Sequence, residues 1–278
     1  MWFRVAARVR GVTTTLGVFG IVVGVVGGLA VADGSGLDSI ALVLGGVGFA
    51  MLIAGTALTL VPLAPRIAAR PIAPVVAGRW RALNSPASKV PSHGTHGHGQ
   101  TFAVDLVYEP AEGARPEFGQ GPGFRAPQDF PAFGRELYAP DDGLVVAVRD
   151  NARDHRSRSN MLAYAYMMVD GSIRELFGSR NVLGNHVIVD LGDGTFAALA
   201  HLQHGSARVR RGQRVRRGEQ LARCGNSGNS SEPHVHLQLM DHRWPLIAAG
   251  MPFVFTGADI DDQDSAAGVP ANDRFIRA

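Results

Sequence analysis

Two long stretches without charged residues, near the start of the chain, constrain its fold most. The first runs from Gly11 to Ala32 and the second from Ser39 to Pro65, and each is about as long as a helix that spans a bilayer. Neither stretch has the polar face expected of a soluble core helix of this length. The sequence therefore predicts a membrane region over residues 1–65, with two helices joined by a short acidic loop, Asp33 to Asp38.

The first stretch has a second interpretation, as a signal peptide. Arg4, Arg8 and Arg10 precede it, and Ala30-Val31-Ala32 is similar to a cleavage site. We favour a membrane helix because the apolar stretch is longer than a usual signal core, and because a second stretch follows at once.

The rest of the chain alternates between patterned and irregular segments. A Pro- and Arg-rich segment, 66–89, is expected to be a juxtamembrane linker whose basic residues lie near lipid headgroups. Insertions are expected near 109–131 and 150–180, and a poorly ordered tail over 257–278. With 27 basic and 24 acidic residues, the chain lacks the strong positive field that would suggest a nucleic-acid partner.

Strand patterns surround several polar residues. The run 101–108 alternates, with Phe102, Val104 and Leu106 on one face and Asp105 on the other. A charged group flanked by apolar residues costs free energy unless it is paired or coordinated, so Asp105 is a candidate metal ligand. Two strands joined by a turn are expected over 137–148, and a hairpin over 184–196.

The stretch from Cys224 to Asp241 contains His234-Val235-His236, which follows a run of turn-forming residues and precedes the alternating Leu237-Gln238-Leu239. On a strand, His234 and His236 would point to the same side. Imidazole binds zinc and titrates near neutral pH, so this pair suits a metal ligand beside a general acid or base. The lone Cys224 is interpreted as a small, partly buried residue in preference to a nucleophile.

The run 225–230, Gly-Asn-Ser-Gly-Asn-Ser, followed by Pro233-His234-Val235-His236, resembles the signature of the M23 metallopeptidases, LytM/lysostaphin-type zinc endopeptidases that cut peptide cross-links in bacterial cell walls. Ala200-His201-Leu202 is similar to the family's second motif, and 209–219 to the paired turns between them. The resemblance covers roughly residues 75–256. It implies a mainly β domain with an antiparallel, sandwich-like sheet, a Zn2+ site of two histidines and one aspartate, and two catalytic histidines.

Carried onto this chain, the resemblance makes Asp105 and His236 zinc ligands and His201 and His234 the catalytic pair. The third ligand is less direct, because Thr101 stands where a tight His-x-x-x-Asp spacing would place a histidine. A stretched form of the motif favours His93. Two alternatives are open, His96 and His98, and the His-Gly run could also be an adventitious metal-binding loop or a flexible connector.

His186 and Asp190 imitate the tight His-x-x-x-Asp spacing. On a strand they would share a face, so a metal pair is geometrically allowed. Their hairpin corresponds to one that carries no ligand in the family, and we therefore expect it to be structural.

Two functions follow as expectations. The first is a membrane-anchored zinc endopeptidase acting on peptidoglycan or another peptide, with membrane lipid as a further partner. The second is a catalytically silent module of the same fold that recruits or activates another wall hydrolase. All five site positions are filled, which favours the enzyme.

The basic residues that flank the apolar stretches indicate a cytoplasmic domain, but the wall-hydrolase motif favours a multi-pass protein whose domain faces outward.

Overall fold

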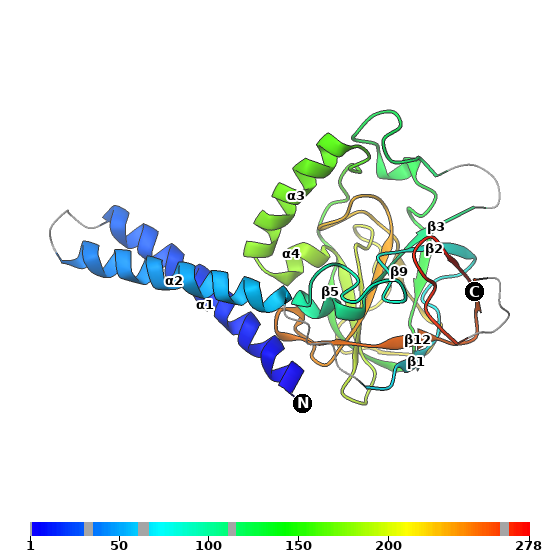
Figure 1. Ribbon diagram of the computed structural model, residues 1–278. Coiled ribbons are helices and arrows are strands. Elements are labelled where there is room, and N and C mark those ends of the chain that lie inside the picture. The colour runs from blue at the N-terminus through cyan, green and yellow to red at the C-terminus, as the bar shows by residue number, and fades with distance from the viewer. Residues whose placement is uncertain (1, 31–35, 61–66, 111–114, 262–266) are drawn as a thin grey trace.

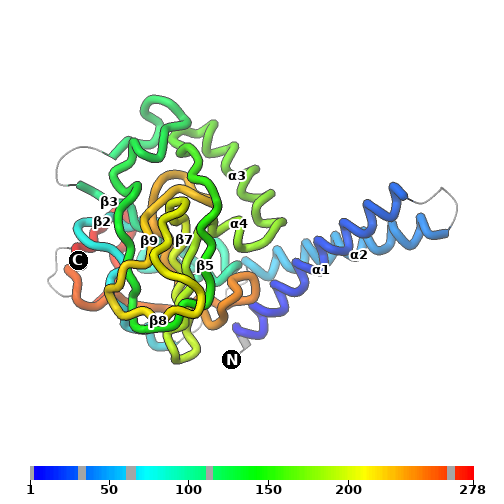
Figure 2. Tube along the Cα trace, turned by 180° about the vertical axis from the view of Figure 1, so that it is seen from behind, coloured from blue at the N-terminus to red at the C-terminus, as the bar shows by residue number. Residues whose placement is uncertain are grey.

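The structure is a computed structural model that describes residues 2–30, 36–60, 67–110, 115–261 and 267–278 (Figure 1). A β-rich domain carries two long helices that project from one side of it (Figures 1 and 2). Its main element is a ten-stranded sheet in which every pair of neighbours is antiparallel. This confirms the predicted fold class.

The order of the strands across the main sheet is β13 (Asp259–Ile260), β14 (Phe275–Arg277), β2 (Arg79–Leu83), β3 (Val104–Tyr108), β10 (Val235–Met240), β7 (Phe196–Ala200), β6 (His186–Asp190), β5 (Gly143–Arg149) and β8 (Arg214–Val215). In addition, β11 (Gly250–Met251) pairs with β10.

Two small sheets accompany the main one. In the first, β4 (Glu136–Tyr138) pairs with β9 (Gln220–Arg223) in the antiparallel sense. In the second, β1 (Arg70–Ile72) pairs with β12 (Phe253–Phe255) in the parallel sense. The two strands expected over 137–148 therefore exist, as β4 and β5, but they belong to different sheets.

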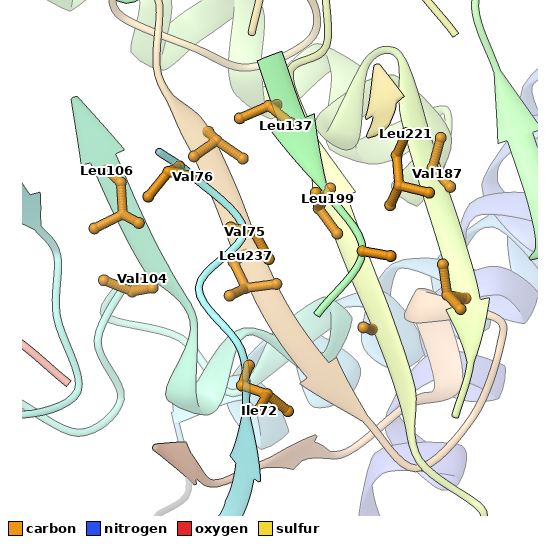
Figure 3. Close-up of a cluster of buried hydrophobic side chains, with 14 of the residues drawn as sticks. Ile72, Val75, Val76, Val104, Leu106, Leu137, Val187, Leu199, Leu221 and Leu237 are labelled. Atoms are coloured by element: carbon orange, nitrogen blue, oxygen red, sulfur yellow. The ribbon is translucent and has the colours of Figure 1, made fainter. Parts of the chain in front are cut away.

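The hydrophobic core lies on one face of the main sheet (Figure 3). Strand β10 alternates: Leu237 and Leu239 point into this core, while His236 and Gln238 lie on the opposite face. Leu137 of β4 and Leu221 of β9 close the core from the other side. The opposite face of β10 carries polar side chains at His236 and Gln238, and Met240 beyond them packs in a second, small hydrophobic cluster with Ile188, Ala198 and Ala248.

The predicted hairpin is present as β6 and β7, with a turn at Asp193-Gly194. The strand expected at 101–108 begins later, at Val104. Residues before it form the short helix η1 (Gly97–Phe102), in which His98 and Gly99 have positive φ. The alternation over 101–103 was therefore misleading, because local turn geometry determines the backbone there.

The segment expected to be a linker, 66–89, contains β1 and β2, and Trp80 is fully buried. Two of its arginines pair with acidic residues of the domain, Arg70 with Asp141 and Asp193, and Arg81 with Glu109. The segment expected to be a tail contains β13 and β14, and β14 pairs with β2. These strands bury Ile260 and Ile276, which are isolated apolar residues in a polar sequence.

Helices α3 (Met161–Leu176) and α4 (Ser179–Leu183) lie beside the polar face of the main sheet. The insertion near 150–180 contains α3, capped at its N-terminus by Asn160, and it is followed by α4. The excursion at 109–131 carries only a short helix among its described residues, η2 (Pro127–Asp129), and a third short helix is η3 (Pro245–Ile247).

Helices α1 (Trp2–Ala30) and α2 (Leu37–Leu60) form an antiparallel pair. Both are long and apolar enough to cross a membrane, and most of their apolar side chains are exposed, unlike those of a soluble core helix. The predicted joining loop lies mostly outside the described residues. The N-terminal end of α1 and the C-terminal end of α2, which we call the domain-side ends, contact the β-rich domain. Arg4 and Arg8 of α1 pair with Asp241, and the carbonyl of Thr59 in α2 accepts a hydrogen bond from the His96 amide.

Candidate metal centre

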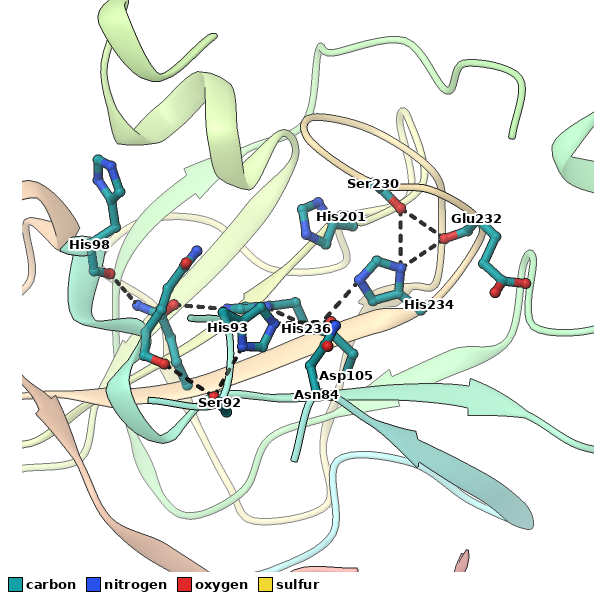
Figure 4. Close-up of polar contacts among 12 residues, drawn as sticks. Asn84, Ser92, His93, His98, Asp105, His201, Ser230, Glu232, His234 and His236 are labelled. Atoms are coloured by element: carbon teal, nitrogen blue, oxygen red, sulfur yellow. Dashed lines mark hydrogen bonds and ion pairs between the residues drawn. The ribbon is translucent and has the colours of Figure 1, made fainter. Parts of the chain in front are cut away.

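A row of directly opposed residues crosses the polar face of the main sheet. Asp105 on β3 lies opposite His236 on β10, which lies opposite Ala200 on β7. Opposed residues in an antiparallel sheet point to the same side. His201 follows Ala200 at the end of β7. The strand register therefore brings Asp105 and His236 together (Figure 4).

Asp105 is the centre of this cluster. Its Oδ1 lies 2.9 Å from His236 Nδ1, and its Oδ2 lies 3.0 Å from His93 Nε2 and accepts a 2.9 Å hydrogen bond from Asn84 Nδ2. His93 reaches it from the loop before η1, where the Ser92 amide donates to the Thr101 carbonyl and Ser92 Oγ lies 3.0 Å from His93 Nδ1. The loop is thus tied to the start of the strand that carries the carboxylate.

One ligand atom from each of His93, Asp105 and His236 lies within 4.8 Å of the others. Two imidazole nitrogens and a carboxylate oxygen form a donor set that zinc accepts in open sites. The three residues therefore form a candidate metal site, and the donor chemistry fits the ion that the sequence resemblance implies.

The hydrogen bonds of Gln238 determine which nitrogen of His236 is available to a metal. The Gln238 amide nitrogen donates to the His98 carbonyl at 2.8 Å, and because a carbonyl can only accept, this assigns the orientation of the amide. Gln238 Oε1 then lies 2.8 Å from His236 Nε2 and accepts its proton. His236 Nδ1, which faces Asp105, is left without a proton in the neutral ring, as a ligand must be.

The electrostatics of the cluster separate the pKa values of its members. Burial would raise the pKa of Asp105, but the nearby His93 and His234 hold it well below its ordinary value. Burial lowers the pKa of His236 despite the attraction of Asp105. The site therefore keeps an ionised carboxylate next to a neutral imidazole, which are the protonation states that metal binding requires.

His201 and His234 lie beside the three candidate ligands, with ring centroids 4.8 Å apart. His201 Nδ1 donates to the Ser227 carbonyl and His234 Nδ1 to the Glu232 carbonyl, so each ring keeps its Nε2 free. His234 Nε2 lies 3.5 Å from Asp105 Oδ1.

Their surroundings differ. Burial, with His234 and His236 nearby, lowers the pKa of His201 well below its ordinary value. Burial opposes protonation of His234 too, but Asp105 outweighs it and raises the pKa of His234. The pair therefore combines a neutral imidazole with one that holds a proton more readily.

These residues lie in a cleft of about 530 Å³. Helix α3 forms one wall with Tyr164, Met167, Met168, Gly171, Ser172 and Glu175. A Cβ atom on Gly171 would lie 2.8 Å from Asn229 Oδ1, so glycine permits the close approach of α3 to the loop before His234.

The other candidate residues lie away from the three ligands. His96 Nδ1 contacts Thr101 Oγ1, and His98 contacts Ser179 and Glu175, so neither ring is directed at Asp105. His186 is buried and bonds the Gly184 carbonyl, while Asp190 accepts from the Gly192 amide at the other end of β6. Within the described residues, this pair does not form a metal cluster.

Sequence reasoning missed two polar partners of the site. Gln238 was available from periodicity, because it lies two residues beyond His236 on the same face of β10. Asn84 had no such signal, since it follows β2 in a left-handed conformation, with φ of 48°, and reaches Asp105 only through strand pairing.

Comparison with known proteins gives one sequence match and several structural ones. The sequence model of peptidase family M23 matches residues 126–247, which include His201, His234 and His236 and begin after His93 and Asp105.

A zinc-containing peptidase from Vibrio cholerae is 18% identical, with a TM-score of 0.30 over 64% of this chain and 36% of that one, so this chain spans about a third of its length. The catalytic domain of lysostaphin from Staphylococcus simulans is 16% identical, with a TM-score of 0.31 over 54% and 77%. The catalytic domain of the prophage-encoded M23 protein EnpA from Enterococcus faecalis, in a mutant form, is 21% identical, with a TM-score of 0.27 over 52% and 92%.

The family match covers the segment from η2 to η3, which holds three of the five clustered side chains, His201, His234 and His236. It coincides with the Gly-Asn-Ser-Gly-Asn-Ser and Pro-His-Val-His motifs, and the fold supplies the antiparallel sheet on which these motifs converge. The structural similarities are too low to add to this. Residues 126–247, with the motifs that they contain, are therefore similar to peptidase family M23.

Proposed function

We propose that this protein is a membrane-anchored zinc metalloendopeptidase that hydrolyses peptide bonds in peptidoglycan cross-links or stem peptides. The convergence of His93, Asp105 and His236, with two further histidines alongside, carries the proposal. In this assignment His93 Nε2, an Asp105 oxygen and His236 Nδ1 hold Zn2+. A bound zinc ion would supply Lewis acidity and make water nucleophilic near neutral pH.

We assign the two acid–base roles in hydrolysis to His201 and His234. His201 offers an unprotonated Nε2 that can orient a water molecule or accept its proton. Asp105 favours the doubly protonated form of His234, and in that form His234 offers a proton from Nε2, either to stabilise charge on the substrate carbonyl oxygen or to protonate the leaving amine. Hydrolysis adds water across the C–N bond, leaving a carboxylate and an amine. The two rings are held in place because each Nδ1 is bonded to a main-chain carbonyl.

Helices α1 and α2 support the membrane part of the proposal. Their exposed apolar surfaces need an apolar surrounding, and their domain-side ends are bonded to the peptidase domain. We place the domain on the outer side, where peptidoglycan lies.

The test is metal content and peptidoglycan cleavage by the full chain in detergent. The expected result is one zinc per chain and release of new amino groups, with both lost in Asp105→Asn. Asp190→Asn is the matched control, because Asp190 has the tight His-x-x-x-Asp spacing from His186 but lies outside the cluster, and it should keep both. Loss of metal in Asp190→Asn alone would refute the assignment.

The silent-module alternative predicts a different outcome. That protein would bind peptidoglycan, and another hydrolase would become more active in its presence, but the purified chain would release no amino groups. The five filled positions favour the enzyme.

A further inference from the structure

Helix α3 has two unlike faces. One face lines the cleft. The other carries an apolar stripe, which we call the outer stripe, of Leu162, Tyr166, Val169, Ile173 and Leu176. These five side chains are between 50% and 79% exposed. Their spacing of four, three, four and three residues places them along one side of a helix, opposite Gly171 and the other cleft-facing residues.

The helix contributes no charged side chain to the outer stripe, and the Arg158 guanidinium lies 5.2 Å from the centre of the Tyr166 ring at one end of it. The nearest charged residues on the helix, Asp170 and Arg174, pair with each other at 2.8 Å, at the flank of the stripe. Phe177, which caps the helix, is 74% exposed, and the exposed Arg180 follows it. An uncovered apolar stripe that ends in an aromatic and a basic residue has the composition of a helix lying in the surface layer of a bilayer.

The position of α3 indicates what covers this stripe. Figures 1 and 2 show α3 on the side of the domain from which α1 and α2 project. Its C-terminal turn and the two long helices line a common cavity, formed by Ser172, Glu175 and Leu176 together with Gly11 and Thr14 of α1 and Leu52 and Thr56 of α2. Leu176, the last residue of the outer stripe, therefore lies next to the surface that α1 and α2 present.

We propose that the outer stripe of α3 inserts into the surface layer of the bilayer that α1 and α2 cross, so that the site cleft opens next to the lipid. The inference rests on the proposed bilayer position of α1 and α2. It deepens the proposed function, because the substrate would then be a peptide held close to the membrane surface, with α3 between that peptide and the lipid.

The test uses the full chain in vesicles of phosphatidylcholine and phosphatidylglycerol, with single nitroxide labels in a Cys224→Ala background. Cys224 is fully buried, so alanine replaces it in a small apolar site. Collisions of the label with oxygen report lipid, and collisions with a water-soluble nickel chelate report solvent. Labels at Val169→Cys and Ile173→Cys should collide with oxygen several-fold more, relative to the chelate, than a label at Met168→Cys.

Met168 is the matched control, because it is 55% exposed on the same helix but lines the cleft. Arg277→Cys, at the end of the chain remote from α1 and α2, serves as a solvent reference (Figure 1). Val22→Cys, an exposed position in α1, reports whether the anchor itself is in lipid.

Each outcome is decisive. Oxygen-rich signals at Val22, Val169 and Ile173, with chelate-rich signals at Met168 and Arg277, support the proposal. A lipid signal at Val22 with solvent signals at Val169 and Ile173 overturns it while the anchor stands. A solvent signal at Val22 refutes the membrane anchor and this inference with it. Spin–spin broadening between α3 labels of different molecules would show a second copy on the stripe and would also overturn the proposal.

Discussion

At the scale of single residues, His234 and His236 lie two positions apart on the same face but have different surroundings. His236 Nδ1 faces Asp105 at 2.9 Å, whereas His234 Nδ1 is occupied by a main-chain carbonyl. We therefore expect His236→Ala to lose stoichiometric zinc. His234→Ala should keep its zinc but lose activity by about 100-fold or more, as is usual for removal of a general acid or base. Elemental analysis and a cleavage assay on the two variants check this, and the opposite pattern would reverse the roles.

Gln238 acts on the site through His236. Its carbonyl oxygen accepts from His236 Nε2 and thereby leaves Nδ1 unprotonated. Removing such a partner of a ligand typically costs about 10- to 100-fold in metal affinity. Gln238→Leu should lower zinc affinity by this factor in a competition titration with a chelator. Gln120→Leu, at an exposed position, is the control, and equal affinity in both variants would show that Gln238 has no such role.

His186 should make the stability of the fold depend on pH. Burial lowers its pKa to about 4; the bond to the Gly184 carbonyl opposes this, and Arg149 and Arg180 reinforce it. An unfolded histidine titrates near 6.5, so between pH 6.5 and 4 the unfolded chain binds more protons than the folded one. The free energy of unfolding should fall as the pH falls through this window, by about 3 kcal/mol from this residue.

The variant that tests this is His186→Gln, which removes the titrating group. Its unfolding free energy, from denaturant titrations of chelator-treated protein in detergent at pH 7 and pH 4.5, should change less than that of the wild type. Equal changes in the two proteins would mean that His186 titrates normally in the folded state.

At the scale of secondary-structure elements, the packing of α1 against α2 depends on glycine. A Cβ atom on Gly48 would lie 2.6 Å from the Ile21 amide nitrogen and 2.7 Å from the Gly17 carbonyl oxygen. Small residues that allow backbones to approach closely are typical of helix pairs in membranes. Gly46, two residues earlier, has nothing within 4 Å of the same position. Gly48→Val should therefore separate the helices, and Gly46→Val should not.

A disulfide provides the readout for this prediction. A Cβ atom on Gly27 would lie 3.2 Å from Ala41 Cβ, so cysteines at these two positions are close enough to form a disulfide with a small adjustment. The Gly27→Cys/Ala41→Cys protein should cross-link on mild oxidation. Added Gly46→Val should leave the cross-linked fraction unchanged, and added Gly48→Val should reduce it. Equal cross-linking in both would show that the glycine contact is dispensable.

Elements with strong periodicity were predictable from the sequence, and those created by tertiary contacts were not. The long apolar runs indicated α1 and α2, and alternation around Asp193-Gly194 indicated β6 and β7. By contrast, β14 is a three-residue strand in a polar tail, and it is ordered by pairing with β2. Helix α3 was missed because its apolar residues face outward as well as toward the cleft, so no single polar face marks the helix.

The same distinction applies to the site. The motifs singled out His201, His234 and His236, because each motif lies within one strand and the loop next to it, β7 for His201 and β10 for His234 and His236. The choice among His93, His96 and His98 needed the fold. All three histidines lie in the segment between β2 and β3. The left-handed backbone at His98 and Gly99, together with the hydrogen bonds of Ser92, determines which of the three rings faces Asp105.

At the scale of the whole molecule, the contacts of α1 and α2 with the domain determine how the chain can lie across a membrane. Arg4 and Arg8, in the first turns of α1, pair with Asp241, and Thr59, at the end of α2, is bonded to His96. Both domain-side ends therefore belong on the same side of the bilayer as the domain. An outward-facing domain requires the N-terminus to be outside as well, against the charge bias of the flanking arginines.

We expect the domain to face outward because peptidoglycan, the proposed substrate, is there. The measurement is protease digestion of cells whose wall has been removed but whose membrane is intact, with epitope tags at the two ends of the chain. Both tags should be removed without permeabilisation, while a cytoplasmic marker protein stays intact. A domain that is digested only after permeabilisation would place the peptidase in the cytoplasm and exclude the assembled wall as its substrate. Removal of one tag but not the other would contradict the pairing of Arg4 and Arg8 with Asp241, since that contact requires both ends to share one side.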